Sequence, residues 1–479
     1  MIMLATALTV IAIVTQDQSA LRAAPRDSAA RQAVLWQGDN LEIRGEKGDF
    51  LQVYDHRRER AGYIKASQVR VQSLKPEAAP ELLAIVRFLK EAPGSEALGI
   101  GYAAAYLQAV PAGQVDSEVF AALGNMSDRL ARRATAGRSG KAGDALAAHL
   151  EVAASYGMNL VSYERDGQVQ LCSNGEAQGR VLALPAPEID KALAALSLTR
   201  HECVPPTLTP PERFAFDNWR AEVLDRVALA ELPAVLKNRL HLRQAGVWAS
   251  LAYQRARRPE AGPDAAREAA TRAIDELAKI NPAELMESDA NAYSDAAIRV
   301  GASRWAAEPD LPPKPGKAAA GLGLRVSAGQ PGETCVHLVD ARHDEKNPLL
   351  TRCTWGLVWP ASTAVAPRGE ALTVAVQPLD TWREMWVFRK GADGWMVDVV
   401  PPALDTPNLG YVEFAGWVPG GRHLLAAREV RSGERYRTTF ETLSMHTLVT
   451  DKKADKPASL TPFYRWQSPL WKAGTVALR

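Results

Sequence analysis

The stretch that decides the N-terminal fold is residues 38–65, GDNLEIRGEKGDFLQVYDHRRERAGYIK. Apolar residues alternate with polar ones in two short runs, Leu41–Ile43 and Leu51–Val53. Gly-Asp, Glu-Lys-Gly-Asp and Arg-Glu-Arg-Ala-Gly sequences separate these runs, and such sequences are typical of turns. Short strands at this spacing predict a small β-barrel over residues 13–74.

The same region is similar to bacterial SH3 (SH3b) domains in the order of its elements. An LRAAP element comes first, followed by Gly-Asp before a strand, an aromatic-x-x-Val strand and a Gly-aromatic-hydrophobic step. Phe50 and Tyr63 stand where these domains usually carry Trp. The resemblance covers about 60 residues, an eighth of the chain, and implies a domain that binds peptidoglycan or a peptide. The matching residues are Leu21, Arg22, Pro25, Gly38, Leu41, Ile43, Phe50, Val53, Gly62, Tyr63 and Ile64.

Aromatic side chains make this predicted barrel the best candidate for a functional surface. An aromatic groove would suit a peptide or a glycan strand. The alternative is that Trp36, Phe50 and Tyr63 fill a very small core. For Tyr54, strand alternation predicts a side chain that points away from the Leu51–Val53 face. The predicted groove residues are Trp36, Asp39, Phe50, Tyr54, His56 and Tyr63.

The N-terminus resembles the apolar core of a signal peptide. Residues 1–14 are apolar except for two Thr, and the first charge is Asp17. Fourteen residues are too few to span a bilayer comfortably, but they suit a leader, and small residues favour cleavage after Ala12. Since no basic residue precedes the apolar run, a start further upstream or a buried strand remains the alternative. We therefore expect a leader over residues 1–12 and a periplasmic or envelope-associated protein with no transmembrane span in its mature chain.

Four cysteines fall as two local pairs, Cys172 with Cys203 and Cys335 with Cys353. No C-x-x-C motif is present, which argues against a zinc or thioredoxin-like site. In an oxidising compartment the pairs predict two disulfides, whereas in a cytosolic protein they would be buried thiols.

A region of Ala, Leu, Glu and Arg follows over residues 75–307, with apolar residues every three to four positions. This spacing predicts an irregular helical domain. Residues 158–177 interrupt it and predict a β-hairpin around Asp166-Gly167. The Pro-rich segment 308–319 predicts a linker.

The last region, residues 320–479, predicts an antiparallel β domain, because β-branched residues alternate between Gly-rich turns. A repeat with a period of 52 aligns residues 364–377 with 416–429, and Phe388 with Phe440. The pattern x-x-Pro-x-Gly-x-x-Leu-x-x-Ala resembles blades of TolB-type β-propellers, which implies four-stranded antiparallel units. Two units are clear, whereas a closed propeller needs at least four.

No constellation of residues identifies a catalytic or metal site, and no cofactor is expected. Lys+Arg of 57 against Asp+Glu of 55 gives a net charge of +2, which disfavours nucleic-acid binding. Neither G-x-S-x-G nor H-E-x-x-H occurs. The segment His337–Asp344 offers metal-capable groups but is better explained as a strand end and a polar turn, and His201–Cys203 as a half-cystine at a helix exit.

Two functions fit these features. The first is an envelope binding or scaffolding protein whose SH3-like domain binds peptidoglycan or a protein peptide. The second is an exported cell-wall hydrolase with its site in the helical region, which a deep pocket with converging His, Asp and Glu over residues 75–310 would favour.

Overall fold

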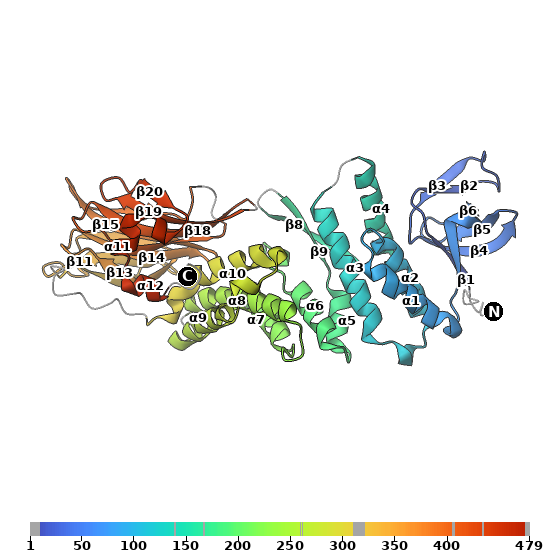
Figure 1. Cartoon of the computed structure of the whole chain (residues 1–479), viewed down its shortest axis with the longest axis horizontal. Helices are drawn as coiled ribbons and strands as arrows, with labels where there is room; N and C mark the ends of the chain where they lie inside the picture. Colours follow the sequence, from blue (N-terminus) through green and yellow to red (C-terminus); the bar gives the residue numbers. More distant parts are fainter. Residues whose placement is uncertain are drawn as a thin grey trace. The chain divides into compact units, whose positions relative to one another are not determined.

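The computed structural model describes residues 10–137, 140–165, 168–258, 260, 262–309, 321–404, 408–433 and 435–474. The chain forms two compact units (Figure 1). Unit 1 comprises Met1–Leu208 and Arg226–Leu232, and unit 2 comprises Thr209–Asp225 and Pro233–Arg479. The fold is α+β, with an N-terminal antiparallel sheet, a helical middle and a C-terminal antiparallel sheet. Residues 1–9 of the predicted leader and 310–319 of the predicted linker lie outside the described residues.

Unit 1 begins with a seven-stranded antiparallel sheet in the order β3-β2-β6-β5-β4-β1-β7. Strands β3 and β7 are its edges, so the sheet is open and the predicted closed barrel is not confirmed. The strands are β1 (Val10–Val14), β2 (Ser19–Arg22), β3 (Arg31–Leu35), β4 (Asn40–Lys47), β5 (Phe50–Asp55), β6 (Arg60–Lys65) and β7 (Val69–Ser73).

One face of this sheet forms a small apolar core, because strand alternation sends every second side chain to it. The other face of β1 carries Ile11 and Ile13, which pack among the helices of unit 1. The core of the sheet consists of Ala12, Val14, Leu21, Leu35, Leu41, Leu51, Val53, Ile64 and Val69.

The predicted cleavage after Ala12 falls inside strand β1. This strand pairs with β4 on one side and β7 on the other. Ile11, Ala12 and Ile13 are each at most 2% exposed. The end of the apolar N-terminal run is therefore a buried strand, which is the alternative that the sequence left open.

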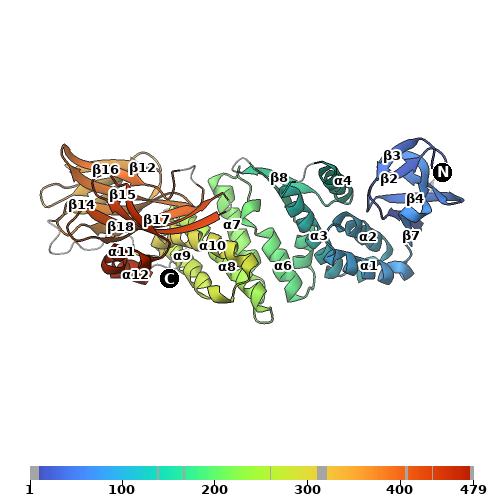
Figure 2. The ribbon, with the colours of Figure 1, turned by 45° about the horizontal axis from the view of Figure 1, so that its top comes forward.

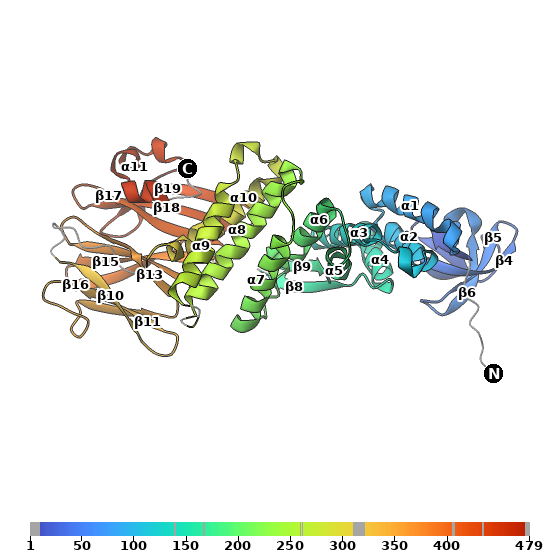
Figure 3. The same ribbon diagram turned by 90° about the horizontal axis from the view of Figure 1, so that it is seen from below.

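The helices of unit 1 follow the sheet, with α1 and α2 next to it (Figure 3). The predicted hairpin is confirmed as β8 paired with β9, although its turn residues 166 and 167 lie outside the described residues. The elements are α1 (Ala79–Glu91), α2 (Glu96–Ala109), α3 (Ser117–Thr135), α4 (Lys141–Ser155), β8 (Leu160–Arg165), β9 (Gln168–Ser173), α5 (Glu176–Ala183) and α6 (Glu188–Leu198).

Unit 2 combines six described α-helices with the C-terminal sheets, so the boundary between the units falls inside the region 75–307. Helix α10 packs on β17, where Gly301 faces the ring of Tyr411 so closely that a Cβ would collide with it. The helices are α7 (Pro210–Asp225), α8 (Ala234–Ala256), α9 (Pro263–Ala278) and α10 (Ala290–Ser303), followed at the C-terminus by α11 (Thr461–Trp466) and α12 (Pro469–Gly474).

The strands of unit 2 form a three-stranded sheet, β10-β11-β12, and an eight-stranded sheet. The larger sheet follows the path β13-β14-β15-β17-β18-β19-β20, and β16 pairs with β15. Its strands are β13 (Leu357–Val365), β14 (Ala371–Leu379), β15 (Trp382–Gly391), β16 (Gly394–Val400), β17 (Gly410–Trp417), β18 (His423–Ser432), β19 (Arg435–Ser444) and β20 (Thr450–Ala454), and the smaller sheet contains β10 (Gly323–Ala328), β11 (Thr334–Val339) and β12 (Leu350–Thr354).

The propeller-like repeat is not confirmed, because the sheet does not close and the pairing differs between its halves. Leu372 of β14 lies opposite Phe388, but Leu424 of β18 lies opposite Leu443 rather than opposite Phe440. The two phenylalanines that the sequence aligned therefore occupy different positions in their hairpins.

Candidate functional site

Three of the predicted site residues lie on one solvent-facing surface of β4, β5 and β6, which we call the outer face. Leu51 and Val53 point into the core, so Gln52 and Tyr54 point away from it, as the sequence predicted for Tyr54. Gln52 lies opposite Tyr63 on β6, and the neighbouring pair on the same face is Tyr54 with Ala61. Tyr54 and Tyr63 are thus diagonal neighbours, at a spacing that large aromatic side chains can bridge.

Charged side chains surround the ring of Tyr54. The guanidinium of Arg44 lies 4.0 Å from the ring centroid, and the His56 ring meets it edge-on at 4.9 Å. Glu42 accepts a hydrogen bond from Arg44 Nε at 3.2 Å and lies 2.7 Å from His56 Nε2. Mainly because of the hydrogen bond from Arg44, the pKa of Glu42 is below its usual value. The outer face therefore presents an aromatic ring held between the Arg44 guanidinium and the His56 ring. Its residues are Glu42, Arg44, Gln52, Tyr54, His56 and Tyr63.

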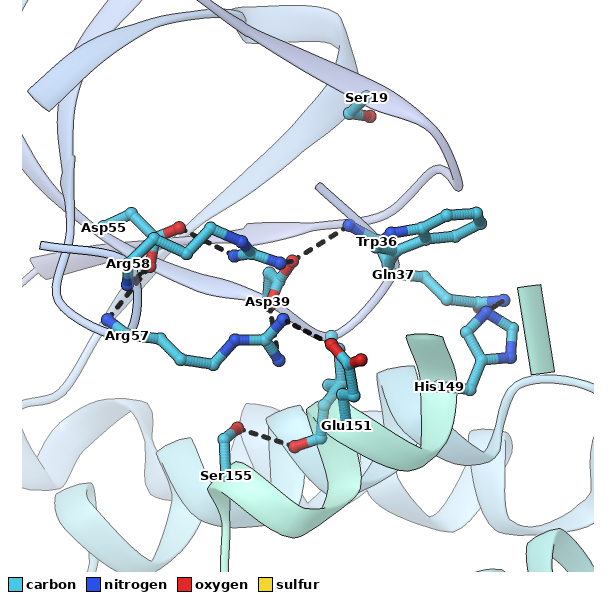
Figure 4. Close-up of polar contacts among 12 residues, drawn as sticks. Ser19, Trp36, Gln37, Asp39, Asp55, Arg57, Arg58, His149, Glu151 and Ser155 are labelled. Carbon is cyan, nitrogen blue, oxygen red and sulfur yellow. Dashed lines mark hydrogen bonds and ion pairs between the residues drawn. The ribbon is translucent and has the colours of Figure 1, made fainter. Parts of the chain in front are cut away.

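The other predicted groove residues lie elsewhere. Phe50 is buried, with 7% of its surface exposed, although its position in β5 matches that of Tyr54. Trp36 and Asp39 lie in the turn between β3 and β4, which faces helix α4 (Figure 4). The Trp36 ring packs edge-on against His149 of α4, with centroids 6.3 Å apart.

Asp39 belongs to an ion-pair cluster rather than to a groove. It is 4% exposed, accepts hydrogen bonds from the Trp36 backbone N–H at 3.0 Å and from Arg58 Nη2 at 3.1 Å, and lies 3.4 Å from Arg57 Nη1. Arg57 also approaches Glu151 of α4 at 3.7 Å (Figure 4). These contacts hold the β3–β4 turn on the helix.

Gly38 explains why this turn approaches the helices so closely. Its φ of +92° favours glycine, and a Cβ there would collide with the backbone carbonyl of Ala97. The Gly38 carbonyl accepts a hydrogen bond of 2.7 Å from the Tyr156 hydroxyl. Burial raises the pKa of Tyr156, so this hydroxyl stays a donor.

The sequence missed a second polar contact between the sheet and α4. His149 is 3% exposed, and its Nε2 lies 2.9 Å from Asp17 Oδ1 and 3.2 Å from Gln37 Nε2. Because a carboxylate only accepts, the shared proton lies on His149 Nε2. Burial opposes ionisation of Asp17, but the hydrogen bond with His149 brings the pKa of Asp17 below its usual value. No sequence pattern marks this pair, whose members are 132 residues apart.

Both predicted cysteine pairs lie at disulfide distance. Cys172 and Cys203, called the hairpin disulfide below, have Cα atoms 5.7 Å apart, and Cys172 is 3% exposed. Cys335 and Cys353, called the sheet disulfide, lie directly opposite each other on β11 and β12, with Cα atoms 3.9 Å apart. These pairs are consistent with an extracytoplasmic location.

The groups near the sheet disulfide that could bind a metal ion are already bonded or hydrogen-bonded to one another. Glu333 lies beside Cys335 and Cys353, with candidate ligand atoms within 4.8 Å of one another, but the two sulfurs are bonded together. His343 Nδ1 lies 2.8 Å from Asp340 Oδ1, which also accepts the His343 backbone N–H at 2.9 Å. Asp340 and His343 therefore form a polar turn after β11, as predicted.

Unit 2 contains a buried ion cluster that the sequence also missed. Arg304, beyond the end of α10, and Arg383 of β15 both donate to Glu413 of β17, at 3.2 Å and 3.1 Å. All three are at most 7% exposed. Burial opposes ionisation of Glu413, but the two arginines bring its pKa below the usual value. Nearby, burial raises the pKa of Glu429 to about 7.

The hydrolase hypothesis needs a pocket in the helical region. Among the described residues, an open hollow of about 810 Å³ follows α9, and a void of about 10 Å³ lies between α3, α5 and α6. Glu276 on the hollow lies 2.7 Å from His241 Nδ1 and accepts a hydrogen bond from Lys279 at 2.9 Å. The Glu276 carboxylate is therefore already engaged by His241 and Lys279.

Comparison of the chain with protein-family models, curated proteins and solved structures finds no match. Within the described residues, no helix is long and apolar enough to cross a membrane.

Proposed function

We propose that this chain is a periplasmic or envelope-associated binding protein whose N-terminal sheet, of bacterial SH3 type, binds peptidoglycan or an envelope peptide through its outer face. The observation that carries the proposal is the pair Tyr54 and Tyr63, which project side by side from β5 and β6.

The chemistry of the outer face suits an extended ligand. Tyrosine rings offer a large contact area at a low cost in conformational entropy. Arg44 lies over one face of the Tyr54 ring and His56 meets its edge, so the ring is already ordered before a ligand contacts it. Gln52 and the Tyr hydroxyls can exchange hydrogen bonds with glycan hydroxyls or with a peptide backbone.

Two further features support the proposal. The two disulfide-distance pairs favour an oxidising compartment. In unit 2, strands β13–β16 and β17–β20 form two successive four-stranded antiparallel groups, which we interpret as blade-like units that offer a second interaction surface.

Cosedimentation with purified peptidoglycan, and capture of envelope peptides, test the proposal. Tyr54→Ala is expected to weaken binding by about tenfold or more, as truncation of a central interface aromatic typically does. Tyr54→Phe keeps the ring and removes only its hydroxyl, so it is expected to weaken binding less than Tyr54→Ala does. Phe88→Ala on α1 is the matched control, because Phe88 is an exposed aromatic of the same unit (74% exposed).

Thermal unfolding of each variant separates binding from folding. Tyr54 is half-buried, so its truncation should leave the sheet folded. Phe50 is a poorer probe, because truncation of a buried aromatic typically costs about 3–5 kcal/mol. Equal binding by wild type and a folded Tyr54→Ala variant, or no binding by wild type to any envelope fraction, would refute a ligand role for the outer face.

A further inference from the structure

The C-terminal helices α11 and α12 of unit 2 expose large apolar side chains within seven residues of one another. Tyr464 is 68% exposed, Trp466 46% and Leu470 83%. We call these three residues, with Lys456, Arg465 and Lys472, the C-terminal patch. Figure 2 shows α11 and α12 together beside β17 and β18.

The exposure is fixed by how the two helices are anchored. Phe463 of α11 is fully buried and Trp471 of α12 is 6% exposed, and their rings lie 5.2 Å apart. Both pack against Phe440 of β19, with centroids at 5.1 Å and 6.3 Å. Since these two side chains point inward, their neighbours along the helices are turned to solvent.

The segment that joins the helices is also held in place. The Ser468 backbone N–H donates to the Ala415 carbonyl of β17 at 2.7 Å. Gly416 lies directly under this segment, where a Cβ would collide with the Trp466 carbonyl. Trp466 and Leu470 flank the anchored segment, so they cannot retract into the core without breaking it.

Charge distinguishes this surface from an ordinary apolar patch. Residues 456–474 carry three basic side chains, Lys456, Arg465 and Lys472, and no acidic one. All three are exposed. Residues 451–455 just before them carry two Asp and two Lys, so their charges balance and the local net charge stays near +3.

We propose that the C-terminal patch binds the surface of an anionic phospholipid bilayer. Trp and Tyr favour the headgroup level, where an apolar ring meets water. Lys and Arg near the membrane surface are attracted by anionic lipid headgroups. Side chains of both kinds lie within a short stretch of α11 and α12 here, and Leu470 is the most exposed apolar residue among them. The contact is peripheral and small, so binding is reversible and depends on ionic strength.

Vesicle cosedimentation of the full chain tests this inference. We expect binding to phosphatidylglycerol/phosphatidylcholine vesicles, little binding to phosphatidylcholine alone, and loss of binding as salt rises from 0.05 to about 0.5 M. Lys472→Ala is expected to weaken binding about fivefold. Trp466→Ala/Leu470→Ala is expected to weaken it at least tenfold.

The chain offers a matched control for the double variant. Trp355 (61% exposed) and Leu404 (97% exposed) are exposed residues of the same unit outside the C-terminal patch. Trp355→Ala/Leu404→Ala should therefore bind vesicles as wild type does. Thermal unfolding midpoints close to wild type would confirm that both double variants are folded.

Three results would overturn the inference. They are the absence of binding to anionic vesicles at millimolar lipid, equal binding by both double variants, and equal binding to neutral and anionic vesicles. If the first of these results is found together with self-association that depends on Trp466, the partner of the C-terminal patch is instead a second copy of the chain. None of these results bears on the outer face of unit 1, which is tested with different ligands and variants.

Discussion

Replacing Glu429 by Gln should change how the stability of unit 2 depends on pH. Glu429 lies in the middle of β18, opposite Tyr411 of β17 and Thr438 of β19, and is 5% exposed. Burial raises its pKa from 4.5 to about 7, and the nearby Glu413 carboxylate adds to the shift. The folded unit therefore holds this carboxyl group protonated at pH values where the unfolded chain releases the proton.

The magnitude follows from the two pKa values. Stability from the raised pKa is fully present below 4.5, the unfolded value, and is lost as pH rises towards 7, the folded value. Between pH 5 and pH 8 the linkage relation gives a loss of about 2–3 kcal/mol in wild type. Gln cannot ionise, so Glu429→Gln should not lose this contribution.

Tryptophan fluorescence during urea unfolding reports mainly on the stability of unit 2. Trp36 is in unit 1, and the other 11 of the 12 tryptophans are in unit 2. The free energy of unfolding is measured at pH 5, 6, 7 and 8 for wild type, Glu429→Gln and the exposed control Glu268→Gln. Relative to wild type, we expect the free energy of unfolding of Glu429→Gln to rise by about 2–3 kcal/mol between pH 5 and pH 8. Parallel curves for wild type and Glu429→Gln would refute the reasoning.

Two further predictions concern the disulfides and the β3–β4 turn. Dithiothreitol should reduce the sheet disulfide before the hairpin disulfide, because Cys353 is exposed and Cys335 partly exposed, whereas Cys172 is only 3% exposed and Cys203 only partly exposed. Differential alkylation followed by peptide mapping measures the order, and reduction of the hairpin disulfide first would contradict it. Gly38→Ala should destabilise unit 1 by about 2–3 kcal/mol, because of both its φ and the collision with Ala97. Gly48→Ala, with φ +59° and open space around it, should cost only about 1 kcal/mol, and hydrogen exchange over residues 10–73 compares the two.

Features that depend on local sequence could be predicted. The alternation around Leu51–Val53 gave the outward direction of Tyr54, because each strand residue faces the opposite way from its neighbour. The β8–β9 hairpin and the two cysteine pairs could also be predicted, because each joins residues that are close in the sequence and closes a short loop. Phe50 shows the limit of alternation, because its position in the strand is outward and yet it is buried.

The polar contacts between distant segments could not be predicted. Asp17 and His149 are 132 positions apart, and Arg304 and Glu413 are 109 apart. Such pairs depend on how a helix docks on a sheet, which no period or motif in a single sequence records. The sequence wrongly assigned Trp36 and Asp39 to a groove. Their turn faces helix α4, and the position of this helix could not be read from the sequence.

Strand β1 shows why the end of an apolar N-terminal run can form part of a folded sheet. Ala12 and Val14 face the core of the sheet, while Ile11 and Ile13 face the helices of unit 1, so no polar residue interrupts the strand. A continuous apolar run is then required by the fold, and it has the same composition as a signal-peptide core. Cleavage after Ala12 would remove three of the five residues of β1, together with their pairing to β7. Strand β1 contributes side chains both to the core of the sheet and to the core of the helices of unit 1. Its loss would therefore expose apolar surface in both cores.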